Sequence, residues 1–231
     1  LGVLIVNLVL VFFLVMALSG ITLNKEIDAS AFSYVIAIDC SESMLAEDFL
    51  PTRLDAAKSS AIKFVESLPY ETPVAILSFS GDSQINSLLT KNKNKQISSI
   101  ESIDVCFIKG TDIEEVVINS LDILTSEENK ALIIFSDGQI NTGNLSETIN
   151  LARKNNLVIH TIGIGTVFGG ETPFGLSKLD ENSLKSLSFN TGGKYFHVDK
   201  NFNEISNNLN KFTKKIVQIE LSNYILIFVL I

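Results

Sequence analysis

The sequence predicts an α/β fold in which a doubly wound, mostly parallel β-sheet is flanked by helices and an apolar segment lies at each end of the chain. Two patterns predict this fold. Short β-branched runs are apolar nearly throughout, which is typical of strands buried on both faces of a parallel sheet. Segments with the 3.6-residue period of amphipathic helices lie between these runs. Strands that alternate with helices over short connections favour an open sheet with right-handed crossovers.

The expected elements follow in order along the middle of the chain. Strands are expected at residues 32–38, 74–79, 131–136 and 157–165, with a short one at 194–198. Helices are expected at residues 53–68, 112–124, 146–155, 180–190 and 203–215. The clearest apolar stripe belongs to the second of these helices and consists of Ile113, Val116, Val117, Ser120, Leu121 and Leu124.

Both ends of the chain are apolar. Residues 1–18 carry no charge and would span roughly 27 Å as a helix, close to the hydrocarbon thickness of a bilayer. We expect a retained transmembrane helix there, although Ala17-Leu18-Ser19 has the small-x-small pattern of a signal-peptidase site and keeps a cleaved signal peptide open. Residues 221–231 are expected to begin a second transmembrane helix that the sequence truncates. A linker at 19–30 and one globular domain at 31–215 complete the expected layout.

Charge and cysteine content restrict the function classes. The net charge of −8, with two arginines among 18 basic residues, argues against nucleic-acid binding, which needs a dense basic surface. Cys40 and Cys106 form neither a disulfide framework nor a metal-binding spacing. A free buried thiol is the expectation for each, and a bridge between them stays open if the domain lies outside the membrane. His160 and His197 lie within strand-like runs and are expected to be core residues rather than metal ligands.

Polar residues gather at the predicted carboxyl edge of the sheet, where ligands bind in doubly wound folds. Asp39, Ser41 and Ser43 follow the first strand, and Asp137 follows the third. Thr111 is expected in a capping position at the start of a helix. The five residues form an all-oxygen set in which hydroxyls outnumber carboxylates, which suits Mg²⁺ or Mn²⁺, or Ca²⁺ in a roomier site. The set lacks the histidine and cysteine ligands that zinc prefers.

Each of these features also has a purely structural explanation. Ser41 and Ser43 could cap a helix, Thr111 could be an ordinary N-cap, and Asp137-Gly138 is a common turn pair. Their joint occurrence in three loops on one predicted edge favours the metal site.

Three separated motifs carry a resemblance to a known family. The stretches Asp39-Cys40-Ser41-Glu42-Ser43, Gly110-Thr111 and Ser136-Asp137-Gly138, in this order, resemble the metal-ion-dependent adhesion site (MIDAS) of the von Willebrand factor type A (VWA) domain, whose fold is Rossmann-like. The resemblance covers roughly residues 31–215. Within the family, the chain looks most like the membrane-anchored Bat-type (aerotolerance-operon) proteins of bacteria and archaea, on stretches that include DCSESMLAEDFLPTRLDAAK, KGTDIEE and ALIIFSDGQINTGN.

This resemblance implies a metal centre and a function. Ser41, Ser43 and Thr111 would contact the metal through their hydroxyls, and Asp39 and Asp137 would act mainly through bound water. An Asp or Glu of a partner protein would fill the open coordination position, so that the metal joins two proteins. The resemblance also implies a MoxR-type AAA+ ATPase as a companion. Asp112 stands where a small or amide residue is common, and this extra carboxylate bears on partner affinity more than on metal binding.

The sequence therefore predicts a Mg²⁺-dependent protein-interaction module rather than an enzyme, anchored in the cytoplasmic membrane with its domain on the outer face. Two other interpretations stay open. A metal-free scaffold of the same fold would bind partners through its helical faces. A Mg²⁺-dependent phosphohydrolase of the haloacid dehalogenase type would have its nucleophile at Asp39, but Ser41 stands where that chemistry needs a carboxylic acid.

Overall fold

The computed structural model describes residues 2–5, 7–8, 11–12, 22–27, 32–106, 108–198 and 215–220. The chain divides into two compact units. One unit comprises Leu1–Ala29 and Lys214–Ile231, and the other comprises Ser30–Thr213.

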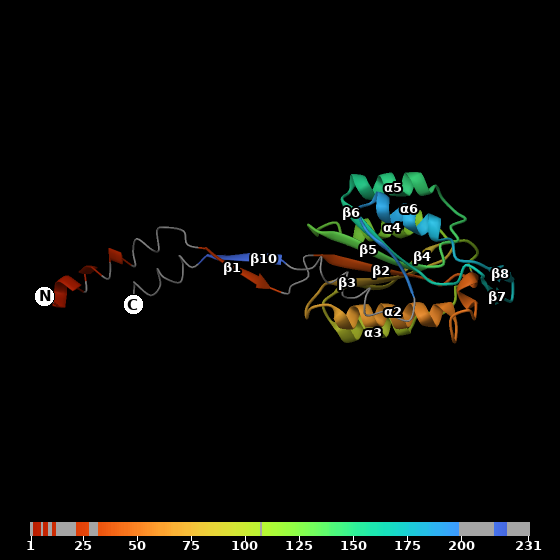
Figure 1. Cartoon of the computed structure of the whole chain (residues 1–231), viewed down its shortest axis with the longest axis horizontal. Helices are drawn as coiled ribbons and strands as arrows, with labels where there is room; N and C mark the ends of the chain where they lie inside the picture. The colour runs from red at the N-terminus through yellow and green to blue at the C-terminus, as the bar shows by residue number, and fades with distance from the viewer. Residues whose placement is uncertain are drawn as a thin grey trace. The chain divides into compact units, whose positions relative to one another are not determined.

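The larger unit is built on a six-stranded sheet in the order β4-β3-β2-β5-β6-β9 (Figure 1). The strands are β2 (Ser33–Asp39), β3 (Val74–Phe79), β4 (Ser83–Thr90), β5 (Lys130–Ser136), β6 (Leu157–Gly163) and β9 (Tyr195–His197). Only the pairing of β4 with β3 is antiparallel within this sheet. The doubly wound, mostly parallel sheet that the sequence predicts is therefore confirmed.

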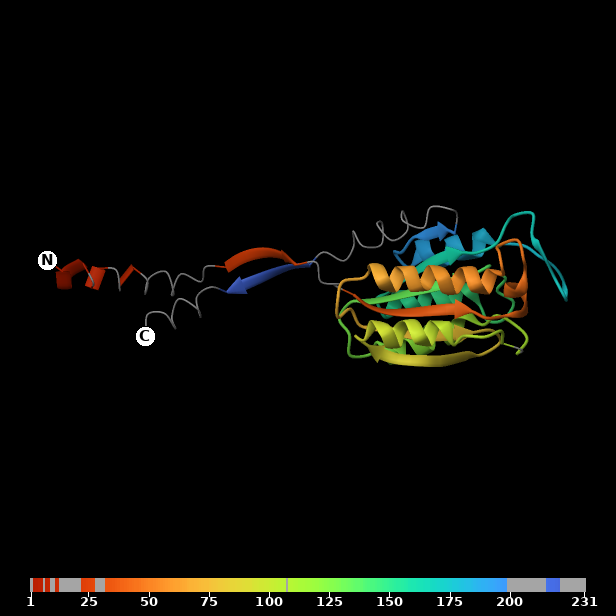
Figure 2. The same ribbon diagram turned by 90° about the horizontal axis from the view of Figure 1, so that it is seen from below.

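Helices cover both faces of this sheet (Figure 1). One face carries α2 (Arg53–Ser67) and α3 (Lys93–Glu101), which lie side by side (Figure 2). The other carries α4 (Ile113–Ile123), α5 (Leu145–Lys154) and α6 (Glu181–Asn190). The central strand β2 is buried along its whole length, because successive side chains enter opposite core layers. Ile36 and Ile38 pack with the α2 side, and Val35 and Ala37 with the α4 side.

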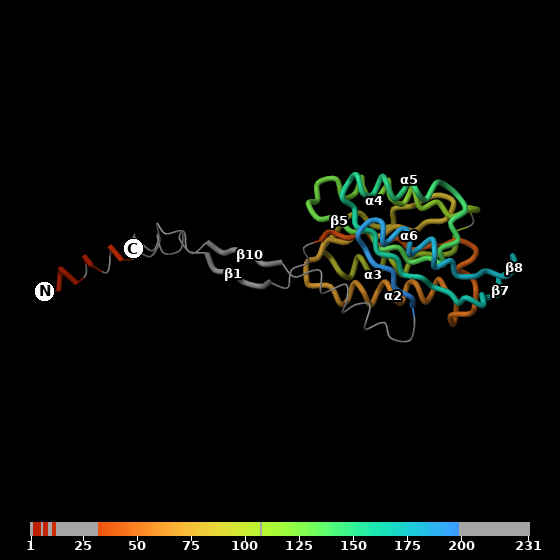
Figure 3. The backbone as a smooth tube through the Cα atoms, turned by 45° about the horizontal axis from the view of Figure 1, so that its top comes forward, coloured from red at the N-terminus to blue at the C-terminus, as the bar shows by residue number. Residues whose placement is uncertain are grey.

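Several elements of this unit were not predicted from the sequence. They are β4, α3, the short 3-10 helix η1 (Glu42–Leu45) and a hairpin of β7 (Gly170–Thr172) and β8 (Gly175–Ser177). The edge strand β4 and the helix α3 are mostly polar and partly exposed, so neither shows the apolar periodicity that marks a buried element. The hairpin extends outward at the carboxyl edge of the sheet (Figures 1 and 3).

The smaller unit contains a two-stranded antiparallel ribbon. Strand β1 (Thr22–Ile27) pairs with β10 (Lys215–Glu220), with Thr22 opposite Glu220. The sequence predicts a linker at 19–30, and the structure has β1 within this range. The sequence gives no local signal of this strand, because its partner β10 lies far away in the chain. The helix expected at 203–215 falls outside the described residues except for Lys215, which begins β10.

The expected membrane spans fall mainly outside the described residues, which leave out all of 221–231 and the greater part of 1–18. In the part of the chain that the structure describes, no helix combines the length and the apolar character needed to cross a bilayer.

Candidate metal centre

Two buried carboxylates lie at the centre of the sheet's carboxyl edge. Asp39 ends β2 and Asp137 directly follows β5, and these two strands are neighbours. The chain passes from β2 to β3 and β4 on one side and to β5, β6 and β9 on the other, so the strand order reverses between β2 and β5. A reversal of this kind opens a crevice at the carboxyl ends of the strands, where ligands bind in doubly wound folds. Both predicted carboxylates are therefore at the ligand-binding edge.

Asp39 is fully buried but well supplied with hydrogen bonds. The Ser41 amide donates to its Oδ1 at 2.9 Å, and the Ser136 hydroxyl donates to its Oδ2 at 2.6 Å. Burial raises the pKa of Asp39 to about 7, with a further contribution from the negative charge of Asp137, while these hydrogen bonds act in the opposite direction. A cation at this edge would favour the ionised form of Asp39.

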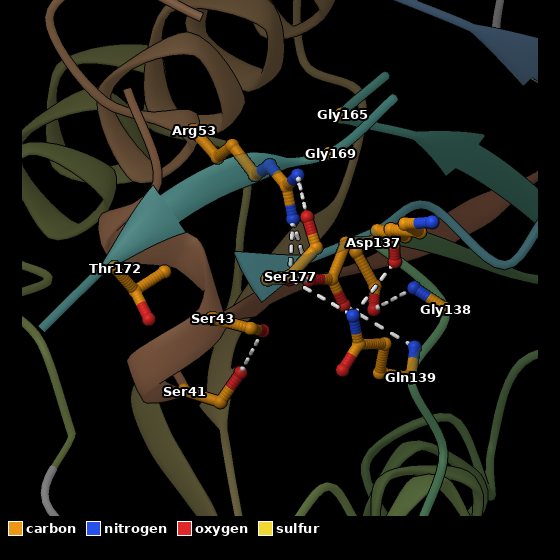
Figure 4. Close-up of polar contacts among 12 residues, drawn as sticks. Ser41, Ser43, Arg53, Asp137, Gly138, Gln139, Gly165, Gly169, Thr172 and Ser177 are labelled. Atoms are coloured by element: carbon orange, nitrogen blue, oxygen red, sulfur yellow. Dashed lines mark hydrogen bonds and ion pairs between the residues drawn. The ribbon is translucent and has the colours of Figure 1, made fainter. Parts of the chain in front are cut away.

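The two serines of the first loop present their hydroxyls to each other. Ser41 precedes η1 in the N-cap position, yet its side chain makes no capping hydrogen bond. Its Oγ lies 3.0 Å from Oγ of Ser43 instead (Figure 4). Neighbouring ligands of an octahedral Mg²⁺, with bonds of about 2.1 Å, are about 3 Å apart. The spacing of the serine oxygens therefore fits the hydroxyl ligands of such an ion.

Thr111 does not cap the helix that follows it, which corrects the sequence prediction. The N-cap of α4 is Asp112, whose Oδ1 accepts from the amides of Glu114 and Glu115. Thr111 is buried, and its amide donates to Oδ1 of Asn141 at 2.8 Å. Since Asp112 performs the capping, the Thr111 hydroxyl is free of that role.

A single cavity of about 380 Å³ brings the three hydroxyl residues together. Ser41, Ser43 and Thr111 all line it. Asp39 and Asp137 are not among the residues that line this cavity. The five predicted site residues thus gather at one edge, with the hydroxyls at the cavity wall and the carboxylates buried. Among the described residues, no group of three or more His, Cys, Asp or Glu could hold a metal, so a metal here would depend on hydroxyl ligands.

Asp137 has a cationic partner that sequence reasoning missed. The buried guanidinium of Arg53, from the start of α2, donates through Nη1 to Asp137 Oδ2 at 2.9 Å (Figure 4). The Ser177 hydroxyl, at the end of β8, donates to the same oxygen at 3.0 Å. The Gln139 amide donates to Asp137 Oδ1 at 3.2 Å. Asp137 is therefore held in place from three sides and is neutralised by an ion pair.

Arg53 also ties the surrounding loops together. It donates through Nε and Nη2 to Asp48, at 2.7 and 2.8 Å, and through Nη2 to the Ser177 carbonyl at 2.9 Å. Asp48 in turn accepts from the amide and the hydroxyl of Thr166. Asp48 is therefore part of this network, and only 8% of its side chain is exposed. Arg53 was missed because a charged side chain at the start of an amphipathic helix gives no sequence signal of burial.

The two cysteines form a disulfide, so the prediction of free thiols is wrong. Cys40 and Cys106 are joined by an S–S bond of 2.11 Å, and the Cys106 amide also donates to the Cys40 carbonyl at 2.7 Å. The bridge connects the loop of Ser41 and Ser43 to the segment that leads to Thr111. Local sequence cannot show this pairing, because the fold alone brings together residues 66 positions apart.

Both histidines have structural partners. His160 is buried in β6, and its Nδ1 accepts from the Lys194 amide at 3.2 Å. Burial, and then the charge of Lys194, lowers the pKa of His160 to about 4. His197 Nε2 lies 2.9 Å from the Gly165 carbonyl oxygen.

Comparison with known proteins relates this fold to a known family. Residues 34–139 match the von Willebrand factor type A domain. Relatives named UPF0353 protein come from Nocardia farcinica, at 24% identity over 213 residues, and Mycobacterium leprae, at 22% over 202 residues. These matches cover 80% and 79% of this chain but only 63% and 60% of the relatives, so the chain spans about three fifths of their length.

Solved structures agree with the sequence match. BatB from Bacteroides thetaiotaomicron superposes with a TM-score of 0.73 at 26% identity, over 78% of this chain and 98% of that protein. An aerotolerance-related membrane protein from Bacteroides fragilis has a TM-score of 0.73 at 24% identity, over 79% and 98% of the two chains. Proximal thread matrix protein 1 from the mussel byssus, with a zinc-occupied MIDAS motif, reaches 0.65 at 18% identity, over 86% of this chain and 50% of that one.

The domain is a von Willebrand factor type A domain. The chain that carries it is similar to the Bat-type proteins of this family, as the resemblance in its motifs predicts.

Proposed function

We propose that this protein binds a Mg²⁺ ion at the MIDAS-type centre of Asp39, Ser41, Ser43, Thr111 and Asp137, and that the ion captures an acidic side chain of a partner protein. One observation carries the proposal. Three hydroxyl residues line one cavity beside two buried carboxylates, and neither Ser41 nor Thr111 uses its hydroxyl as a helix cap.

The charges at the centre support an acidic ligand. Of the two carboxylates, Asp137 is already paired with Arg53, and the three remaining ligands are neutral hydroxyls. A divalent ion there would keep part of its positive charge. A carboxylate from outside would therefore be attracted to its open coordination position.

Oxygen ligands and hydroxyl spacing favour Mg²⁺, with Mn²⁺ or Ca²⁺ as alternatives. Zinc in the MIDAS motif of the mussel protein supports metal binding by this fold. The proposed function is binding without catalysis. Ser41 stands where a phosphohydrolase of the haloacid dehalogenase type would need its general acid.

We also propose that the domain is anchored to the cytoplasmic membrane, faces its outer side and works beside a MoxR-type AAA+ ATPase. The Cys40–Cys106 disulfide supports an oxidising compartment, since disulfides are rare in the reducing cytosol. The apolar residues 1–18 support the anchor.

A pull-down from membranes tests the proposal. The full chain is used as bait in Mg²⁺ and in EDTA, together with Asp39→Ala and the control Asp122→Ala, which changes an exposed carboxylate on α4. We expect partners that the wild type and the control retain in Mg²⁺ and that Asp39→Ala loses. Identical partners for all three baits, unaffected by EDTA, would favour the metal-free scaffold. Mg²⁺-dependent hydrolysis of p-nitrophenyl phosphate, lost in Asp39→Ala, would favour the phosphohydrolase.

A further inference from the structure

Large apolar side chains line the same cavity as the hydroxyl groups. Ile108, Phe174 and Leu176 all contribute to its wall. Their exposed fractions are 49%, 65% and 60%, so packing inside the domain does not explain their presence. Val167 and Phe168, earlier in the segment that carries the hairpin, are also exposed. Exposed apolar residues that gather beside a cavity indicate an interaction surface.

Hydrogen bonds within the hairpin hold the backbone of Phe174 in place. The Thr172 hydroxyl donates to the Gly175 carbonyl at 2.8 Å, and the Phe174 amide donates to the Thr172 hydroxyl at 3.2 Å. Gly175 has φ +129, which residues with a side chain rarely adopt, so the turn depends on this glycine. The turn thus fixes the backbone of Phe174, whose side chain remains largely in solvent.

The same hairpin is attached directly to the metal centre. Ser177, the last residue of β8, donates to Asp137 and accepts from Arg53 Nη1 at 2.8 Å (Figure 4). Leu176, which lines the cavity, is its neighbour in the chain. The apolar side chains and the metal ligands therefore belong to one connected structure and would meet a ligand together.

We infer that the ligand of this centre is a segment of a partner protein in which an Asp or Glu is directly flanked by large apolar side chains. This inference rests on the proposed function. The carboxylate would reach the metal at the Ser41, Ser43 and Thr111 end of the cavity. The flanking side chains would pack on Ile108, Phe174 and Leu176.

The charges of the wall give no preference for flanking residues of either sign. The charged residues that line the cavity are Glu42 and Lys109, one of each sign. They offset each other, so the wall selects neither basic nor acidic neighbours of the metal-bound carboxylate. Ile108, Phe174 and Leu176 offer affinity through burial of apolar area, which favours apolar side chains beside the carboxylate.

Selection from displayed peptides tests the inference. A random library of 12-residue peptides is selected on the full chain in Mg²⁺ and eluted with EDTA. We expect the eluted peptides to share an Asp or Glu with large apolar residues on at least one side. Acidic peptides with polar flanks would overturn the inference and leave the proposed function standing. A library from which EDTA releases no peptide would overturn both.

Variants of the hairpin give the matched comparison. Phe174→Ser/Leu176→Ser should bind the selected peptides at least about tenfold more weakly, because truncating central apolar contacts has effects of this size. The affinity of this double variant for Mn²⁺ should equal that of the wild type, and equal affinity also shows that the domain has folded. If the double variant does not fold, Phe174→Ser alone replaces it. Tyr70→Ser, which removes an 85%-exposed aromatic residue between α2 and β3, is the control and should bind normally.

Two results would assign the apolar surface to another ligand. Peptides without an acidic residue that stay bound in EDTA would show that the surface binds apolar segments independently of the metal. Sedimentation with vesicles of phosphatidylethanolamine and phosphatidylglycerol in EDTA, lost in Phe174→Ser/Leu176→Ser, would show that it binds lipid. Either result overturns the inference.

Discussion

Thr111 and Asp112 are adjacent but have different environments. Asp112 caps α4 with its carboxylate, whereas Thr111 lines the cavity with both serines. Thr111→Val removes the hydroxyl at nearly constant volume, so we expect loss of Mn²⁺ binding with little change in stability. Asp112→Ala should instead lower the free energy of unfolding by about 1 kcal/mol and keep Mn²⁺ binding. Titration with Mn²⁺ and urea unfolding of both variants measure this, and the opposite pattern would show that Asp112 holds the metal.

Asp39 should make metal affinity depend on pH. Its pKa is raised to about 7, mainly by burial, so below that pH a metal must displace a proton. We expect the apparent affinity for Mn²⁺ to fall by up to about tenfold per unit as pH falls from 7 to 5. Calorimetry in two buffers of different ionisation enthalpy would detect the released proton. A flat profile would mean that Asp39 is already ionised without metal.

The raised pKa of Asp39 makes the stability of the metal-free protein change with pH in the direction opposite to metal affinity. The folded state binds the Asp39 proton more tightly than the unfolded state, whose pKa lies near 3.8. The contribution of Asp39 to the free energy of unfolding therefore falls as pH rises from about 4 to about 7. Asp39→Asn removes this dependence and is the control for both measurements.

Among the elements, the disulfide links two loops of the candidate centre that the sheet alone does not hold together. Cys40 lies in the core beside Ser41, and Cys106 lies five residues before Thr111. A bridge that closes a loop of 66 residues stabilises the fold by about 4 kcal/mol in the chain-entropy model. Cys40→Ala/Cys106→Ala should lower the free energy of urea unfolding by this order. A change below about 1 kcal/mol would show that the bridge adds little to the native fold.

The elements that the sequence predicted are those whose pattern is local. Strands β2, β3, β5 and β6 are continuous apolar runs, and α4 shows its stripe, so each signals its own burial. The disulfide, the ion pair of Arg53 with Asp137 and the pairing of β1 with β10 each join distant positions. No local pattern encodes such contacts. The site residues were found because three loops carry a motif, whereas the residues that support them carry none.

At the scale of the molecule, the described part of the unit Ser30–Thr213 contains an apolar core on each face of its sheet. The buried residues of both apolar clusters lie between Tyr34 and Val198. We therefore expect the stability of this unit to be independent of the β1–β10 ribbon. We expect a fragment of residues 30–213 to fold by itself and to unfold within a few degrees of the full chain.

Metal binding provides a quantitative test of that fragment. A ligand at 100 times its dissociation constant raises the free energy of unfolding by about 2.7 kcal/mol, which for a domain of this size raises Tm by roughly 5–10 °C. The fragment and the full chain should show the same Mg²⁺-dependent rise, because Asp39, Thr111 and Asp137 all lie within Ser30–Thr213. Thr111→Val should abolish the rise in both, as measured by calorimetric scans with and without EDTA. A rise seen only in the full chain would mean that the smaller unit contributes to the metal centre.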